Sequence, residues 1–312
     1  MARVLCAWEF GGDLGHVRRL IPIARELRAM GHEVTTAFRD SSFTEYAYSE
    51  GFETFIAPLL RVQPQVNPSP LNFSDVLLNL GFQDVNGLSG AMVAWNCLFD
   101  LLEPDVLVAD YAPTAIVTAR LRSIRSVAIG TGFSVPPMRD PIPAMRTWLA
   151  ADPGVLRAID ARLLECVRKA AGQHAARLPA HAFELLKPDA NLLCTFAEID
   201  PFAPRGEGEY VGPQGDATTG MTVEWKRQSG PRVFAYLKPR NPRFDAVLAG
   251  LASLDAEVVV AAPGLAADRA KAMSTASMRV VPAAVNLELL LPQAVKSISS
   301  EPELSAVNVP TM

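Results

Sequence analysis

The stretch Phe-Gly-Gly-Asp-Leu-Gly-His at residues 10–16 constrains the fold most, because it separates two patterns of different period. Residues 3–8 form a short apolar run before it, and residues 21–30 carry apolar side chains at helical spacing after it. A short apolar run is typical of a buried strand, and recurrence at roughly every third or fourth residue is typical of an amphipathic helix. A strand, a glycine-rich loop and a helix therefore open the chain.

The same alternation continues through the first two thirds of the chain. Further strand-like runs lie at 34–38, 52–57, 106–109, 126–129 and 191–196, and helical patterns lie at 41–50, 84–102, 114–121, around Trp148 and at 155–176. Strands that alternate with helices pair in parallel through right-handed crossovers. The run 106–109 is apolar on both faces, as expected of a central strand. We therefore predict a doubly wound α/β sheet.

A second series follows a polar stretch rich in glycine, proline and threonine. Strands are expected at 232–237, 257–261 and 278–281, with helices at 244–254, 268–273 and 286–291. We predict two Rossmann-type domains: an N-terminal domain at 1–213, a linker at 214–230, a partial second domain at 231–294 and an irregular tail at 295–312. The second domain is expected to be incomplete, because three strands are fewer than the roughly five or six of an average sheet.

Composition narrows the function to small-molecule chemistry. A net charge of −4 and a pI near 5.7 argue against a nucleic-acid partner, which normally requires a basic patch. The four cysteines lie far apart without a C-x-x-C pair, which favours reduced thiols over a disulfide framework or a zinc site. Since no segment approaches about 18 consecutive apolar residues, we expect a cytoplasmic protein without a membrane span. The oligomeric state cannot be derived from the sequence.

His16 and Asp110 are the candidate catalytic residues. In parallel sheets ligands bind beyond the carboxyl ends of the strands, and both residues follow such ends. The positive end of the helix dipole favours the neutral imidazole that a general base requires, and a carboxylate can orient that imidazole. If they have no catalytic role, His16 is a polar residue at the start of a helix, and Asp110 is a turn residue whose side chain hydrogen-bonds its own backbone. The loop matches neither G-x-G-x-x-G nor the P-loop pattern, so it is not expected to bind a dinucleotide or a phosphate.

Several pieces of the chain together carry a family resemblance. They are residues 11–35, ending in Gly-His-Glu-Val-Thr, residues 104–110 (Pro-Asp-Val-Leu-Val-Ala-Asp), residues 128–133 (Ala-Ile-Gly-Thr-Gly-Phe), residues 210–213 (Tyr-Val-Gly-Pro) and residues 231–239 and 278–292. In this order they resemble the nucleotide-sugar-dependent GT-B glycosyltransferases that modify macrolides and flavonoids. The likeness extends to about Ala294.

The resemblance implies an inverting transfer of a sugar from a nucleoside diphosphate sugar, of the UDP type, to a hydroxyl of a small apolar acceptor. It implies no metal and no further cofactor. His16 would act as the general base and Asp110 would orient it. The implied acceptor-binding residues are Gly12, Asp13, Phe73, Phe82, Phe133 and Met138. The implied donor-binding residues are Leu237, Lys238, Val281 and Pro282.

The sequence departs from the family after Ala294. A His-Gly-Gly helix start that binds the diphosphate is expected there, but the chain continues as Val-Lys-Ser-Ile-Ser-Ser. We therefore expect a C-terminally incomplete donor domain and little or no activity of this chain alone. A non-catalytic acceptor-binding protein or partner subunit derived from the same family is the alternative. A nicotinamide-dependent oxidoreductase, for which only Asp40 argues, is disfavoured by the missing glycine fingerprint.

Overall fold

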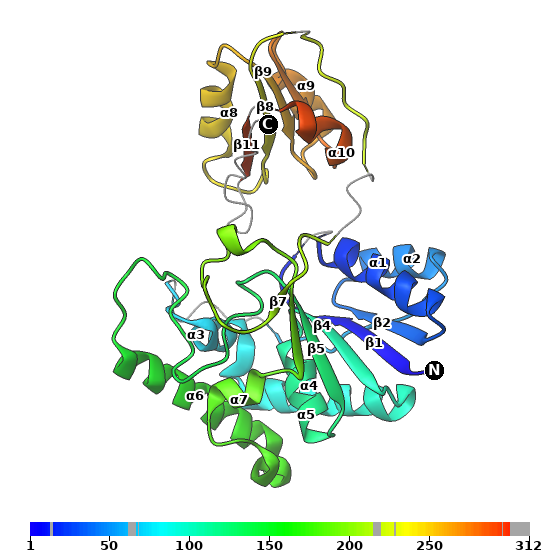
Figure 1. The fold of residues 1–312 in the computed structure, drawn as a ribbon, viewed down its shortest axis with the longest axis vertical. Coiled ribbons are helices and arrows are strands. Elements are labelled where there is room, and N and C mark those ends of the chain that lie inside the picture. Colours follow the sequence, from blue (N-terminus) through cyan, green and yellow to red (C-terminus); the bar gives the residue numbers. More distant parts are fainter. Residues whose placement is uncertain are drawn as a thin grey trace. The chain divides into compact units, whose positions relative to one another are not determined.

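The computed structural model of the protein describes residues 1–12, 15–61, 67, 69–214, 220–227 and 229–294, and the backbone of 296–299 (Figure 1). Contacts divide the chain into two compact units, Met1–Gly215 and Asp216–Met312. Each unit contains one parallel sheet, so the predicted α/β class with two Rossmann-type sheets is confirmed.

The sheet of the first unit has the strand order β3-β2-β1-β4-β5-β6-β7. Its strands are β1 (Arg3–Trp8), β2 (Glu33–Phe38), β3 (Glu53–Ile56), β4 (Val106–Asp110), β5 (Arg125–Gly130), β6 (Ala190–Leu193) and β7 (Glu209–Tyr210). The chain builds outward from β1 to β3, crosses back to β4, and then builds outward to the other edge. The carboxyl ends of β1 and β4 are therefore neighbours, and Trp8 pairs in register with Asp110.

Helices cover both faces of this sheet. They are α1 (Gly15–Ala29), α2 (Thr44–Ser49), α3 (Phe73–Leu77), α4 (Val85–Leu102), α5 (Pro113–Leu121), α6 (Pro153–Ala171) and α7 (Ala182–Leu186). α1 and α2 lie on one face, and α4 and α5 lie on the other (Figure 1). None of the helices that the structure describes is both long enough and apolar enough to cross a bilayer.

Strand β4 shows why this sheet is buried on both faces. Leu107 and Ala109 pack toward α4 and α5, whereas Val108 packs toward α1, because successive side chains of a strand point to opposite faces. Burial of an aliphatic side chain of this size contributes about 1.5–3 kcal/mol. A strand that is apolar on both faces is thus stabilised only at the centre of the sheet.

The helix predicted around Trp148 is wrong. Residues 144–149 form a bridge and turns, and Trp148 is 73% exposed. Prolines at 141 and 143 disfavour a helix that enters this segment, and the next helix, α6, begins only at Pro153. The short elements α3, α7 and β7, in contrast, have too few residues for a period to be visible in the sequence.

The second unit contains a parallel sheet of the order β10-β9-β8-β11. Its strands are β8 (Arg232–Tyr236), β9 (Glu257–Ala261), β10 (Met278–Val281) and β11 (Lys296–Ser299), and its helices are α8 (Phe244–Ala252), α9 (Ala267–Met273) and α10 (Leu287–Leu290). α8 and α9 pack on one face, whereas α10 packs on the other.

Two predictions for this unit are corrected. The tail at 295–312 is not irregular throughout, because 296–299 form β11 beside β8; its other residues lie outside the described part. Strand pairing uses main-chain groups, so an open strand edge can pair with a segment that lacks an apolar pattern. The predicted linker also contributes to the core: Val223 is buried, and the Trp225 indole donates to the Leu290 carbonyl at 3.2 Å.

Candidate active site

The carboxyl edge of the first sheet brings His16 and Asp110 together. Asp110 ends β4 and is fully buried, and His16 is the second residue of α1. His16 Nδ1 lies 3.0 Å from Asp110 Oδ1. The fold thus brings the two candidate catalytic residues of the sequence into contact.

The His16 ring is held by its neighbours. Its face stacks on the Trp8 indole, with ring centroids 5.1 Å apart and planes 18° apart. Its Nε2 lies so close to Gly11 that a Cβ at that position would collide with it, and Gly11 has a φ of +83°. The histidine side chain is only 12% exposed. Because Nδ1 faces Asp110, Nε2 is the ring nitrogen on the side away from that carboxylate.

Asp110 has a second partner, Arg19, which is not among the site residues predicted from the sequence. Arg19 Nη1 donates to both carboxylate oxygens, at 2.9 and 2.8 Å, from a side chain that is 12% exposed. His16 Nδ1, although 3.0 Å from the carboxylate, does not have hydrogen-bond geometry toward it. Arg19 follows His16 by three positions on α1, so both side chains lie on the same face of the helix. This spacing is the signal that points to Arg19.

A second buried carboxylate, that of Glu9, lies directly before the glycine-rich loop at residues 10–16. It accepts hydrogen bonds from the backbone N–H groups of Thr114 and Ala115 at 2.8 and 3.0 Å, and from the Trp95 indole. Burial raises the pKa of Glu9 to about 8, against the opposing effect of these donors. Glu9 therefore ties the end of β1 to α4 and to the start of α5.

Tyr111 connects the imidazole to an apolar region. It directly follows Asp110 and has a φ of +49°, which is rare for a residue with a side chain. Its ring lies 6.4 Å from His16, 6.1 Å from Phe73, 6.0 Å from Phe133 and 5.8 Å from Phe10, between centroids. Such separations are typical of packed aromatic pairs. The aromatic cluster thus extends from His16 to two of the predicted acceptor-binding residues.

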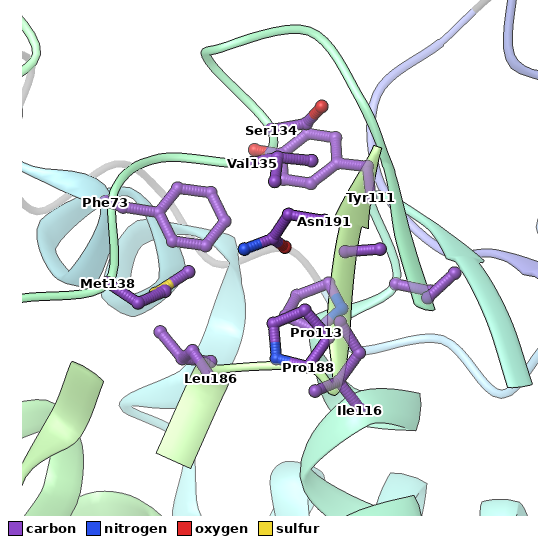
Figure 2. Close-up of a pocket in the computed structure, with 13 residues that line it drawn as sticks. Phe73, Tyr111, Pro113, Ile116, Ser134, Val135, Met138, Leu186, Pro188 and Asn191 are labelled. Atoms are coloured by element: carbon purple, nitrogen blue, oxygen red, sulfur yellow. The ribbon is translucent and has the colours of Figure 1, made fainter. Parts of the chain in front are cut away.

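A small cavity of about 20 Å³ lies beyond this cluster, which is space for about one water molecule (Figure 2). It is lined by Phe73, Ala109, Tyr111, Ala112, Pro113, Ile116, Ala128, Ser134, Val135, Met138, Leu186, Pro188 and Asn191. Figure 2 shows the Asn191 amide among these mostly apolar side chains. Its Oδ1 is buried and has no hydrogen-bond partner in the described part of the chain. Of the predicted acceptor residues, Phe73 and Met138 line the cavity.

The other predicted acceptor residues lie elsewhere. Phe82 is fully buried against Phe10, with centroids 6.4 Å apart, so its side chain belongs to the core. Phe133 is partly buried beside Tyr111. Gly12 is exposed, and Asp13 lies outside the described residues.

An ion pair fixes the loop that carries Val135 and Met138. Arg205 donates to both Asp200 oxygens at 2.7 and 2.8 Å, and to the Val135 carbonyl at 2.6 Å. Burial opposes ionisation of Asp200, but hydrogen bonds from Arg205, the Tyr210 hydroxyl and the Phe202 N–H hold its pKa below the usual value. The Arg205 and Asp200 side chains are 2% and 0% exposed. This pair therefore holds one wall of the cavity in place.

The segment that carries Phe73 is held by Asp160 of α6. Its carboxylate accepts hydrogen bonds from the Asn72 amide at 2.9 Å, the Ser74 hydroxyl at 2.6 Å and the Ile142 N–H at 2.9 Å. Asn72 and Ser74 flank Phe73 in the sequence, so the backbone at Phe73 is anchored on both sides. Burial raises the pKa of Asp160, and the three donors oppose that shift.

The predicted donor-binding residues lie in the second unit. Leu237 and Val281 are buried in its core, so their side chains serve packing, and Lys238 and Pro282 are partly buried. A groove of about 720 Å³ beside β10 and α9 includes Val281 and Pro282 in its lining. In the described part of the chain, no group of three or more His, Cys, Asp or Glu residues is placed to hold a metal ion.

No protein-family model matches the chain, and a search of the curated proteins finds no match. Solved structures do match. The calicheamicin glycosyltransferase CalG4 has a TM-score of 0.60 at 15% identity, over 96% of this chain and 74% of that one. The glycosyltransferase VinC in complex with dTDP has a TM-score of 0.57 at 17% identity, over 95% and 75%. The spinosyn rhamnosyltransferase SpnG with spinosyn aglycone has a TM-score of 0.56 at 17% identity, over 98% and 76%. Likenesses at this level of identity establish architecture, and the chain therefore has the GT-B fold of these glycosyltransferases.

Proposed function

We propose that this protein transfers a sugar from a nucleoside diphosphate sugar to a hydroxyl of a small apolar acceptor. The observation that carries the proposal is the contact of His16 with the buried Asp110, next to an aromatic cluster and at the carboxyl edge of a GT-B sheet. Ligands of parallel α/β sheets bind at this edge.

His16 would act as the general base. Its Nε2 takes the proton of the acceptor hydroxyl while the oxygen attacks the anomeric carbon and the nucleoside diphosphate leaves from the opposite face. The configuration at that carbon is thereby inverted. Asp110 stabilises the imidazolium that forms, as a carboxylate does in other base dyads. General-base catalysis of this kind contributes about 10²–10⁴-fold in rate.

The acceptor would bind on the apolar side of His16. Phe73, Phe133 and Met138 would contribute aromatic and thioether groups there, and Gly12 belongs to the neighbouring loop. The matched SpnG structure contains a spinosyn aglycone, and the VinC structure contains dTDP. For this chain we propose an apolar, hydroxyl-bearing acceptor and a UDP-type donor without a metal ion. Lys238 and Pro282 would face the donor, with Leu237 and Val281 contributing main-chain groups.

A non-catalytic acceptor-binding protein is the second candidate. It is favoured by the second unit. After Ala294, where the resemblance implies a helix start that binds the diphosphate, residues 296–299 form strand β11 beside β8. A partner chain would then supply the donor site.

The experiment that tests the proposal is a single-turnover assay, with the protein in excess over radiolabelled UDP-glucose or dTDP-glucose. Hydroxylated polycyclic aglycones serve as acceptors, and acceptor binding is measured in parallel by calorimetry. Labelled product that depends on His16 supports the transferase. Acceptor binding without product supports the second candidate, and neither binding nor product contradicts both. The expectation of little multiple turnover by this chain alone stays a prediction that the same assay checks.

A further inference from the structure

Asp110 is shared by two basic side chains, and only one of them is a permanent cation. Arg19 contacts both carboxylate oxygens with hydrogen bonds, whereas His16 contacts one oxygen without hydrogen-bond geometry. An arginine side chain stays charged at every pH that a protein experiences. The carboxylate charge is therefore balanced before His16 takes up a proton.

The balance matters because the three groups are buried. Asp110 is 0% exposed, and the side chains of His16 and Arg19 are each 12% exposed. Water and salt screen such charges weakly. A nearby carboxylate favours the imidazolium form, and a nearby cation disfavours it. A carboxylate without such a counter-charge favours the imidazolium form of a neighbouring histidine, and a protonated histidine cannot accept a proton from an acceptor hydroxyl.

The remaining groups around His16 do not replace Arg19. Trp8 and Tyr111 contribute uncharged rings, and the Glu9 carboxyl is directed to the start of α5. Cys194, directly after β6, is near enough to Arg19 and Asp110 to be affected by both charges, but burial raises the pKa of its thiol. Arg39, after β2, donates to the Gly11 carbonyl. Arg19 is thus the cation that contacts the Asp110 carboxylate in the described part of the site.

We propose that Arg19 is a positioning residue that keeps the His16 imidazole neutral and ready to act as a base by balancing the charge of Asp110. That the neutral imidazole serves as a base rests on the proposed function. The effect of Arg19 on the protonation of His16 can be measured on the chain without substrate. This role makes Arg19 the third member of the His16–Asp110 pair.

The test is a ¹⁵N NMR titration of the imidazole groups in the full chain, without substrate. The chain has only four histidines, and a His16→Gln variant identifies the His16 signal. In Arg19→Met the midpoint of the His16 titration is expected to rise by about one pH unit or more. Arg19→Lys, which keeps the charge, is expected to stay near the wild type. A midpoint that is unchanged or lower in Arg19→Met overturns the proposal.

Arg25→Met is the matched control, because Arg25 also lies on α1 and forms an ion pair, but with Glu50. Its effect on the His16 titration is expected to be absent. Should Arg19→Met fail to fold with an unpaired Asp110, the comparison moves to Asp110→Asn with and without Arg19→Met. Arg19 is then expected to lower the His16 midpoint, and equal midpoints overturn the proposal.

Activity gives the independent readout. If the chain transfers sugar, the acidic limb of the pH profile of kcat/KM is expected to move upward in Arg19→Met. At a pH below both midpoints this amounts to about a tenfold loss that is recovered at higher pH. If no transfer is found, the NMR titration still decides the role of Arg19, so failure of the proposed function and failure of this inference are distinguishable.

Discussion

Each of the two sheets contains a buried carboxylate, at opposite ends of its strands. In the first sheet, Asp110 ends β4 and contacts Arg19 and His16. In the second sheet, Glu257 begins β9 and accepts hydrogen bonds from the N–H groups of Lys226 and Arg227, both at 2.7 Å. Both carboxylates are almost completely buried. Asp110 pairs with the Arg19 cation, and Glu257 accepts main-chain hydrogen bonds.

The difference lies in what each carboxylate faces. Ligands of parallel sheets bind at the carboxyl ends of the strands, where Asp110 is located. Glu257 lies at the amino end, where it anchors the segment that enters the second unit. The carboxyl ends of β8, β9 and β10 are followed or formed by the apolar residues Leu237, Ala262 and Val281. A buried carboxylate therefore does not by itself indicate a ligand site in this molecule. The position of the carboxylate at the carboxyl end of its strand is what indicates one.

The largest effect is expected for His16→Ala. Loss of the base should lower kcat about 10²–10⁴-fold, whereas nucleotide binding stays close to that of the wild type. Product formation and calorimetry measure the two effects. His32→Ala is the control, because His32 lies just before β2, where its Nδ1 accepts a hydrogen bond from the Ala2 N–H at 3.2 Å. Loss of nucleotide binding with turnover preserved would show that the role of His16 is misplaced.

Asp200→Asn should have the next largest effect, on stability. Removal of one partner from a buried ion pair costs about 3–5 kcal/mol, measured by urea unfolding. Because the pKa of Asp200 is lowered in the folded state, its contribution is present above the unfolded value of about 4 and is lost as the pH falls below it. Asp100→Asn, which breaks an exposed pair with Arg122, should cost less than about 1 kcal/mol. Equal costs would contradict the importance of the buried pair.

Gly11→Ala tests whether the contact of Gly11 with His16 positions the imidazole beside Asp110. The new Cβ would displace His16 Nε2, and misplacement of a catalytic group by about 1 Å can cost on the order of 10²-fold in kcat. Gly31→Ala is the matched control, since Gly31 also has a positive φ, of +87°, but a Cβ there meets no atom within 4 Å. Steady-state kinetics of both variants provide the check. Similar rates for the two would show that the contact with Gly11 does not position the imidazole.

Glu257→Gln should have the smallest effect, and only on the second unit. Hydrogen bonds to a charged group contribute about 1.5–3 kcal/mol, so the loss of unfolding free energy should lie near or below this range. Hydrogen exchange of the second unit measures it, and Asp245→Asn, from an exposed pair with Arg269, serves as control. A loss of catalysis comparable to that of His16→Ala would break the distinction between the two buried carboxylates.

The sequence predicts the regular elements well where apolar runs are long enough to show a period. The bounds of β1, β9 and β10 coincide with the predicted runs 3–8, 257–261 and 278–281. Short elements such as α7 escape this reasoning because five residues make little more than one helical turn. β11 escapes it because its position depends on the open edge of β8.

Part of the candidate site could also be predicted from the sequence. His16 and Asp110 follow strand ends, and the doubly wound order places the ends of β1 and β4 side by side. Arg19 shares a helix face with His16, but its partner Asp110 is 91 residues away in the sequence. The i,i+3 spacing from His16 favours Arg19 over Arg18, but no local pattern indicates that Asp110 is its partner.

By itself, the sequence determined the α/β class, the two series of strands and the pair His16–Asp110, because periodicity and strand ends are local properties. Only the tertiary structure decided that Arg19 shares Asp110, that Tyr111 joins His16 to the apolar cavity, and that Phe82, Leu237 and Val281 are packing residues. The physical reason is that burial and charge pairing depend on distances between segments far apart in the chain. These distances exist only after the sheets have assembled.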